Sequence, residues 1–198
     1  NSWTTIGIDG DGNFSNVPSA VTTLNLYDGF NADTDVALAV DGTADSMAVV
    51  MKEAVTATDL DIDEAETITI DSEFALTLTT QLSGTDLTSL TVSGDSAVDL
   101  SGIAAAALAT IDASGLTAAA GFTNSSSTSA VAMTVTGNTA ATGYTGALSV
   151  VTGSGDDTVT GTVNADTINT AGGNDVIVAG GGADQITGGA GSDTITLG

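Results

Sequence analysis

The chain has 198 residues, of which 25 are acidic and one is basic, and it contains no histidine or cysteine. A net charge of −24 makes nucleic acid and anionic membranes poor partners, since both require positive charge on the protein. Because 41% of the residues are apolar and 13% are charged, we expect a folded chain. The abundance of Gly, Ala, Thr, Ser, Val and Asp, with a single proline, predicts an all-β protein of short strands and tight turns whose carboxylates bind divalent cations.

The same composition narrows the possible functions. Without histidine or cysteine, the chain cannot assemble a serine triad, a thiol nucleophile or a thiolate metal site. Carboxylate chemistry remains, but aromatic sugar platforms and basic residues are scarce, so we expect no enzymatic activity. No apolar run approaches the ~20 residues that span a bilayer, so we expect no membrane insertion. The first residues lack a signal-peptide pattern, and we expect the chain to be part of a longer protein.

The first acidic segment, residues 9–13, begins like an EF-hand calcium loop. Phe14 stands where that loop needs glycine, and Ala20 stands where it needs glutamate. We therefore expect a turn here, with a lone calcium-binding turn as the alternative.

A second acidic segment, residues 59–64, alternates acidic and apolar residues. On a strand, Asp59, Asp61 and Asp63 would share one face, and Leu60 and Ile62 would share the other. We favour a solvated strand face. The alternative is Ca²⁺ that bridges coils or molecules through these carboxylates.

Between residues 64 and 151, apolar residues alternate with threonine or serine in short runs, which indicates strands with one buried face. The runs recur at steps of 22, 19, 24 and 16 residues, near the roughly 20 residues of a solenoid coil. We predict an irregular parallel β-solenoid over residues 1–152, with a β-sandwich as the rival for part of it. The alanine-rich stretch 101–120 fits a short helix or strands and turns, and we favour the latter. The steps are measured between Ile70, Val92, Ile111, Val135 and Val151.

From residue 153 to residue 198 the sequence repeats at intervals of nine, without a linker after the preceding strands. Each repeat has an aspartate, a branched apolar residue two positions later, and a glycine or asparagine two positions earlier. These registers match the nonapeptide G-G-x-G-x-D-x-U-x, where U is a large apolar residue. A flexible linker would not keep five repeats in register. The aspartates are Asp157, Asp166, Asp175, Asp184 and Asp193; the apolar residues are Val159, Ile168, Ile177, Ile186 and Ile195; and the third set is Gly155, Asn164, Gly173, Gly182 and Gly191.

We interpret each repeat as a turn followed by a short strand. Glycine permits the left-handed backbone conformations of such turns, and asparagine tolerates them, so Asn164 is a mild substitution. Two nonapeptides then complete one coil, with the apolar residues pointing inward and successive coils ~4.8 Å apart. At that spacing, two aspartates of successive coils would repel by ~3 kcal/mol at an effective dielectric constant of about 20.

Several bound Ca²⁺ ions would reverse this repulsion, because Ca²⁺ takes roughly 6–8 oxygen ligands, including carboxylates and backbone carbonyls. Other residues replace some glycines of the first repeats, so we expect tighter sites toward the C-terminus. These replacements are Thr152, Thr162, Asn164, Thr170 and Ala171. The expected aspartate pairs are Asp157–Asp175, Asp166–Asp184 and Asp175–Asp193, and we expect the glycine or asparagine two positions before each aspartate to belong to the calcium sites as well.

The sequence GGAGSDTI at residues 188–195 resembles the repeat of RTX proteins. The resemblance covers residues 153–198 and implies a calcium β-roll in a protein that a Gram-negative bacterium exports unfolded by type I secretion. Such proteins fold when they meet external calcium. The resemblance further implies that turn carbonyls near Gly153, Gly180 and Gly189 are calcium ligands.

Residues 64–151 resemble the central region of Caulobacter-type S-layer proteins, in phrases such as AETITI at residues 65–70 and LATIDASGL at residues 108–116. This resemblance implies a secreted structural protein whose calcium-loaded solenoid self-associates into a lattice on the cell surface. Attachment to cell-surface polysaccharide would then use a part of the protein outside this chain. The alternative is a calcium-rigidified RTX spacer or folding module of a larger secreted adhesin, toxin or enzyme.

Overall fold

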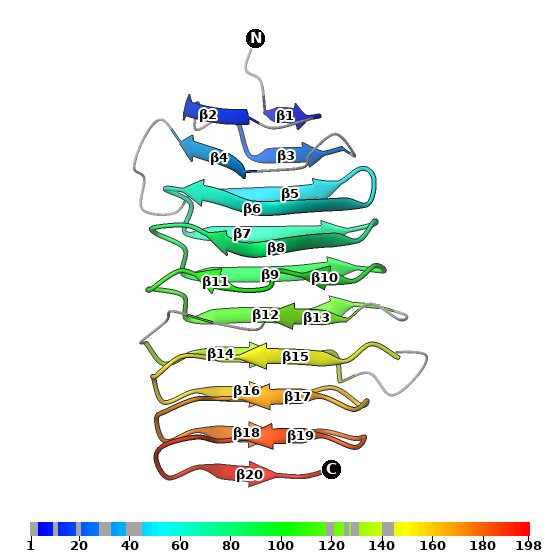
Figure 1. Cartoon of the computed structure of the whole chain (residues 1–198), viewed down its shortest axis with the longest axis vertical. Coiled ribbons are helices and arrows are strands. Elements are labelled where there is room, and N and C mark those ends of the chain that lie inside the picture. The colour runs from blue at the N-terminus through cyan, green and yellow to red at the C-terminus, as the bar shows by residue number, and fades with distance from the viewer. Residues whose placement is uncertain are drawn as a thin grey trace.

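The computed structural model describes residues 4–9, 12–18, 21–27, 33–38, 45–117, 121–124, 127, 131–139 and 145–198. In these residues the chain forms strands and turns and no helix. The strands lie in two sheets, and the chain alternates between the sheets as it advances along the long axis of the molecule (Figure 1). The protein is therefore a β-solenoid, with β1 and β20 at opposite ends of the stack.

The two sheets run the whole length of the stack. The first sheet contains β1 (Thr5–Ile8), β3 (Thr23–Leu26), β5 (Ser46–Met51), β7 (Thr67–Ser72), β9 (Ser89–Gly94), β12 (Thr110–Leu116), β14 (Thr134–Thr136), β16 (Thr158–Thr160), β18 (Val176–Val178) and β20 (Thr194–Thr196). The second contains β2 (Gly12–Val17), β4 (Asp33–Leu38), β6 (Val55–Asp63), β8 (Leu76–Ser83), β10 (Val98–Asp99), β13 (Phe122–Asn124), β15 (Leu148–Val151), β17 (Thr167–Asn169) and β19 (Gln185–Thr187), with β11 (Ile103–Ala104) also paired to β8.

Each of these strand pairs is parallel and joins neighbouring coils, from β1 with β3 to β18 with β20. A β-sandwich is built from antiparallel sheets, so the predicted parallel solenoid is confirmed and the rival fold is wrong. The described part of the alanine-rich stretch, residues 101–117, contains β11, a turn at residues 106–107 and β12, as the strand-and-turn interpretation predicted. In the described residues, no helix is long and apolar enough to cross a membrane.

Inward-pointing apolar side chains form ladders along the interior of the stack. In the first sheet, Leu24 lies opposite Val49, Val49 opposite Ile70, and Ile70 opposite Val92, and all four are fully buried. The alternation of β7, which reads TITIDS, places its apolar residues inside and its threonines partly outside. Burial of each such side chain contributes about 1.5–3 kcal/mol, so these ladders hold the coils together.

The coil register differs from the predicted steps. Ile111 lies opposite Leu90, and Val135 lies opposite Val159 rather than preceding Val151 in one ladder. Val151 belongs to β15 in the second sheet, so the step of 16 residues joined strands of different sheets. Both sheets have the same apolar–polar alternation, and the pattern alone does not tell one from the other.

In the nonapeptide region the coils become regular. Val159 lies opposite Ile177 and Ile177 opposite Ile195, while Ile168 lies opposite Ile186, so aligned residues are 18 apart as predicted. Both sheets continue across residue 152 without a break, and the division of the chain at that point stays a prediction. Burial decreases toward the last coil, where Ile195 is 45% exposed.

Candidate functional site

The five repeat aspartates each stand directly before a short strand. Asp157, Asp175 and Asp193 precede β16, β18 and β20 of the first sheet, while Asp166 and Asp184 precede β17 and β19 of the second. The aspartates therefore form two columns, one at each edge of the solenoid. Asp157, Asp166 and Asp175 are buried, whereas Asp184 and Asp193 are partly exposed.

Hydrogen bonds connect the aspartates of each column along the stack. The backbone N–H of Asp157 donates to Oδ1 of Asp175 at 2.8 Å, and the N–H of Asp175 donates to Oδ1 of Asp193 at 3.2 Å. In the other column, the N–H of Asp166 donates to Oδ1 of Asp184 at 3.0 Å. These are the predicted pairs. One carboxylate oxygen of each downstream aspartate binds the backbone of the preceding coil, which leaves Oδ2 for another partner.

The upstream aspartates already have internal partners for both oxygens. Oδ1 of Asp157 accepts from the N–H of Met133 at 2.8 Å, and the Thr152 hydroxyl donates to its Oδ2. For Asp166, the N–H of Thr162 donates to Oδ2 at 2.6 Å and the Thr162 hydroxyl donates to Oδ1 at 2.8 Å. The threonines that replace glycine in these repeats thus supply hydrogen-bond donors to the carboxylates.

Asp175 lacks such a donor. Its Oδ2 is buried and has no hydrogen-bond partner in the described part of the chain. The corresponding upstream position in its repeat is Thr170, whose hydroxyl donates to the carbonyl of Gly188 at 2.9 Å and so turns toward the next coil. A buried carboxylate oxygen without a donor is costly in free energy, and a bound cation would remove that cost.

Burial also shifts the ionisation of the upstream aspartates. Desolvation raises the pKa of Asp157 and Asp166 above their ordinary value of 3.8. Hydrogen bonds from Thr152 and from the backbone of Met133 partly oppose this rise in the pKa of Asp157, while the negative charge of Asp175 adds to it. Without a cation, these carboxylates are held in an environment that disfavours their charge.

The turns of the last three repeats use the left-handed backbone that glycine permits. Gly180 and Gly189 have φ of 89° and 91°, and Ala171 takes the equivalent position with φ of 61°. Two residues further along each repeat, φ is again positive at Gly173, Gly182 and Gly191.

The first two repeats do not have the left-handed backbone that we predicted for the residue two positions before each aspartate. Gly155 and Asn164 do not have a positive φ, so the interpretation of Asn164 as a left-handed substitute for glycine is wrong. Its side chain instead donates from Nδ2 to the carbonyl of Gly146 in the preceding coil at 2.9 Å. Gly153 is buried, and its backbone N–H donates to the Asp157 carboxylate.

Backbone carbonyls of one coil lie directly against glycines of the next. A Cβ on Gly180 would collide with the carbonyl oxygen of Thr162, and one on Gly189 would collide with that of Ala171. The carbonyl of Gly180 itself faces Gly198 in the same way. Each turn therefore combines a carboxylate with closely approaching carbonyl oxygens, the hard oxygen donors that Ca²⁺ prefers.

These residues fit bound Ca²⁺. The described residues contain no group of three or more His, Cys, Asp or Glu side chains placed to hold a metal ion, so carbonyl oxygens would have to complete the sites. Asp175 and Asp193 would supply carboxylate oxygens at one edge, and Asp166 and Asp184 at the other. The predicted ligand roles stay predictions for all five repeat aspartates and for the carbonyls near Gly153, Gly180 and Gly189. The same holds for the predicted roles of Gly155, Asn164, Gly173, Gly182 and Gly191.

Sequence reasoning missed a third column of polar contacts. The N–H of Asn174 donates to Oδ1 of Asp156 at 2.7 Å, and the N–H of Ser192 donates to Oδ1 of Asn174 at 3.0 Å. The signal was present, because Asp156, Asn174 and Ser192 each stand just before a repeat aspartate and are 18 residues apart. This column ties the exposed sides of successive turns together.

The structure describes only part of the first acidic segment outside the repeats, and all of residues 59–63 in the second. The predicted turn at residues 9–13 includes Gly10 and Asp11, which lie outside the described residues. In β6, Leu60 and Ile62 are fully buried, while Asp59, Asp61 and Asp63 are partly exposed on the opposite face, as predicted.

Comparison with known protein families gives a match in the C-terminal repeats. Residues 149–177 and 169–198 match the family described as RTX calcium-binding nonapeptide repeat (4 copies). No curated protein and no solved structure matches the chain significantly. The C-terminal coils are therefore RTX repeats, which are calcium-binding motifs typical of proteins secreted by Gram-negative bacteria, and Ca²⁺ is the ion that they bind.

Proposed function

We propose that this protein is a calcium-dependent structural component of a bacterial surface layer. The observation that carries the proposal is the uninterrupted stack of parallel coils from β1 to β20, in which the RTX repeats continue both sheets of the upstream solenoid. A stack whose coils share one apolar interior is a stiff rod. Its C-terminal coils depend on Ca²⁺ for charge neutralisation, so this end of the rod would become rigid where Ca²⁺ is abundant, outside the cell.

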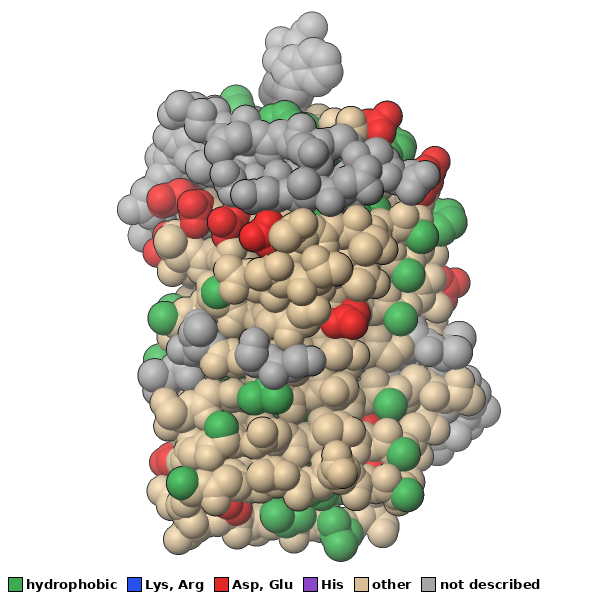
Figure 2. Space-filling view, viewed as in Figure 1, with side chains coloured by type: hydrophobic (Ala, Val, Ile, Leu, Met, Phe, Trp, Pro, Cys, Tyr) green, Lys and Arg blue, Asp and Glu red, His purple; other side chains and the backbone are tan. Residues whose placement is uncertain are grey.

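The surface of the rod supports self-association through cations. Acidic side chains lie on the face shown in Figure 2, and no basic side chain is visible there. With one basic residue in 198, two copies of the chain would repel each other in the absence of divalent cations. Ca²⁺ between carboxylates of neighbouring copies would convert this repulsion into contact, as a lattice on the cell surface requires.

An enzymatic role fits the chain poorly, and we propose a structural role alone. General acid–base or nucleophilic catalysis by histidine or cysteine is impossible, because neither residue is present. The alternative function, a calcium-rigidified spacer or folding module of a larger secreted protein, uses the same repeats but needs no contact between copies.

Assembly distinguishes the two functions. We expect the purified chain to gain β-structure by circular dichroism when Ca²⁺ is added, and to form ordered sheets visible by electron microscopy and light scattering. Mg²⁺ at equal concentration is the control and should give neither response. Calcium-induced β-structure in a chain that stays monomeric at high concentration would refute the surface-layer function and leave the spacer function.

A further inference from the structure

A hollow on the outer face of the second sheet lies far from the RTX turns. It has a volume of about 560 Å³ and is open to solvent on one side. Figure 2 shows a row of acidic side chains on the left of this face at the level of β6. The lining residues are Asp61, Asp63, Gln81, Ser83, Gly84, Thr85, Ala104 and Ala106.

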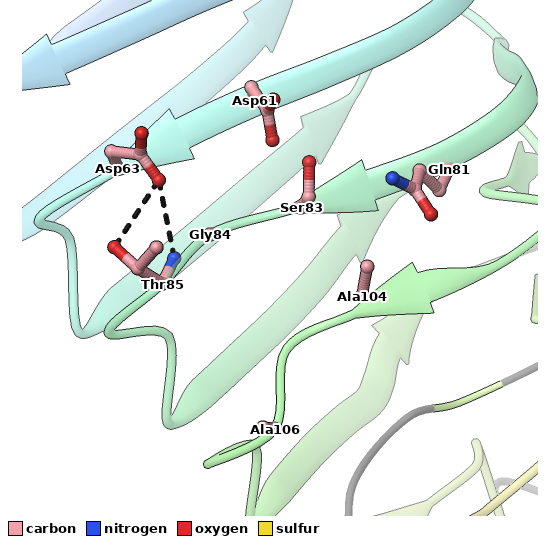
Figure 3. A pocket seen from close by; sticks show the side chains of 8 residues that line it. All are labelled: Asp61, Asp63, Gln81, Ser83, Gly84, Thr85, Ala104 and Ala106. Carbon is pink, nitrogen blue, oxygen red and sulfur yellow. Dashed lines mark hydrogen bonds between the residues drawn. The ribbon is translucent and has the colours of Figure 1, made fainter.

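Coil register brings the oxygen atoms of this hollow together. Asp61 of β6 lies opposite Ser83 of β8, which in turn lies opposite Ala104 of β11. Figure 3 shows the Asp61 carboxylate and the Ser83 hydroxyl pointing toward each other, with Gln81 further along the same strand. Because the Ala104 side chain is small, it leaves open space next to Ser83 on this face of the sheet.

The Ser83 hydroxyl is an independent sign of a missing ligand. Ser83 is only 8% exposed, its oxygen is buried, and that oxygen has no hydrogen-bond partner in the described residues. Buried hydroxyl groups normally have a partner, from protein, water or a bound ion. This one points toward a carboxylate.

Asp63 is held at the edge of the same hollow. The backbone N–H and the hydroxyl of Thr85 donate to its Oδ1 at 3.3 and 3.2 Å (Figure 3). Gly84 makes this approach possible, because a Cβ at that position would lie 2.6 Å from the carbonyl oxygen of Ile62. These contacts fix Asp63 next to the mouth of the hollow.

No basic side chain can neutralise these carboxylates. The single basic residue of the chain, Lys52, precedes β6, whereas Asp61 and Asp63 lie at the end of that strand. At 3.3 Å per residue, Asp61 is about 20 Å of strand away from the start of β6, well beyond the reach of a lysine side chain. Any neutralisation of the negative charge on this face therefore comes from cations in solution.

We infer that this hollow binds a Ca²⁺ ion between Asp61 and Ser83, at a site separate from the RTX repeats. The Asp61 carboxylate and the Ser83 hydroxyl bind the ion directly, Asp63 and the Gln81 side-chain carbonyl supply further oxygens, and water fills the open side. All of these donors are oxygens, which select Ca²⁺ over transition metals that prefer nitrogen or sulfur. The ion joins β6 to β8 and therefore links two successive coils of the upstream solenoid.

Calcium stoichiometry tests the site. We would measure Ca²⁺ bound per chain by equilibrium dialysis for the native protein and for D61N, S83A and D95N variants. Asp95 is exposed and lies on another turn, so D95N is a control for the loss of one charge. We expect D61N to lose one equivalent of Ca²⁺, S83A to bind that equivalent at least tenfold more weakly, and D95N to match the native protein.

A local measurement on the native chain keeps the test decisive if a variant fails to fold. With the RTX repeats saturated by Ca²⁺, trace Mn²⁺ should broaden the amide signals of Ser83, Gly84 and Thr85 in nuclear magnetic resonance spectra, because Mn²⁺ takes the same oxygen ligands. Unbroadened signals at these three amides, or equal Ca²⁺ stoichiometry in D61N and the native protein, would overturn the inference. Neither result would affect the RTX repeats or the assembly test.

Discussion

At the scale of single residues, the turns of this protein satisfy a buried carboxylate in two ways. Thr152 and Thr162 donate hydroxyl or backbone hydrogen bonds to Asp157 and Asp166. Asp175 has no such donor for Oδ2. We interpret the threonines as internal substitutes for a cation, which makes the first repeats less dependent on Ca²⁺ than the last ones.

An Asp175→Asn variant separates the structural role of this side chain from its calcium role. Asparagine keeps an oxygen that can accept from the N–H of Asp157, so the stability in chelator should change by less than about 1 kcal/mol. The negative charge is lost, and the Ca²⁺ concentration at the midpoint of folding, followed by circular dichroism, should rise about tenfold or more. An unchanged calcium midpoint, with Asp95→Asn as the control, would contradict a ligand role for Asp175.

The raised pKa values of Asp157 and Asp166 predict how the calcium-free protein responds to pH. A pKa that is higher in the folded state than in the unfolded state means that folding favours the protonated form. This stabilisation is complete below the unfolded value of 3.8 and is lost as pH rises through the raised folded pKa. The urea midpoint in chelator should therefore fall as pH increases above about 4.

Bound Ca²⁺ requires the ionised carboxylates, so the same measurement in excess Ca²⁺ should reverse or flatten this slope. General repulsion among the other acidic groups also grows with pH, and a D157N/D166N double variant controls for it. The double variant in chelator should show a shallower slope than the native chain. Identical slopes would show that these two carboxylates do not titrate with folding.

At the scale of elements, the repeat is a turn whose glycines have unequal roles. Gly180 has a left-handed backbone and lies against the carbonyl of Thr162, whereas a Cβ on Gly172 would come no closer than 3.7 Å to the Ala190 carbonyl oxygen. Both are glycines of one repeat region. Only the first has a conformation and a contact that require glycine.

These two positions give a matched pair of substitutions. Gly180→Ala should destabilise the calcium-bound protein by about 2 kcal/mol or more, because alanine strains the left-handed backbone and collides with the carbonyl. Gly172→Ala should change stability by less than about 0.5 kcal/mol. Thermal unfolding in Ca²⁺ measures both, and equal effects of the two substitutions would contradict this assignment.

The sequence predicted the elements better than their connections. Nonapeptide register was sufficient to predict the strands, the inward ladder of Val159, Ile177 and Ile195, and the aspartate pairs, because turn and strand recur at one fixed spacing. Upstream, coils differ in length and both sheets alternate alike, so Val151 was assigned to the ladder of Val135. The acidic segment 59–64 pointed to Asp61 and Asp63, but the pairing of Asp61 with Ser83 depends on that unpredictable register and had no sequence signal.

At the scale of the whole molecule, stability is unevenly distributed along the stack. Upstream ladders such as Leu24, Val49, Ile70 and Val92 are fully buried, while Ile186 is only partly buried and Ile195 is 45% exposed. Each coil contacts mainly its neighbours, so local stability follows local burial and local cation binding. The C-terminal coils have the smaller apolar contribution.

Hydrogen exchange should reveal this gradient. In chelator, we expect backbone amides of residues 153–198 to exchange faster than those of residues 45–117, and fastest in the last repeats, as followed by mass spectrometry of peptide fragments. Added Ca²⁺ should protect the C-terminal peptides and change the upstream peptides much less. Equal protection of both regions in chelator would show that the repeats fold without the ion.

The 18-residue register of the last coils also limits how this region can change in length. Positions nine residues apart lie in opposite sheets, whereas positions 18 apart lie in one column, as Asp156 does with Asn174. Deleting nine residues would transfer every later strand to the other sheet and separate such column partners. Deleting or duplicating a whole coil would keep each residue on its own edge, so natural insertions and deletions here should come in multiples of one coil.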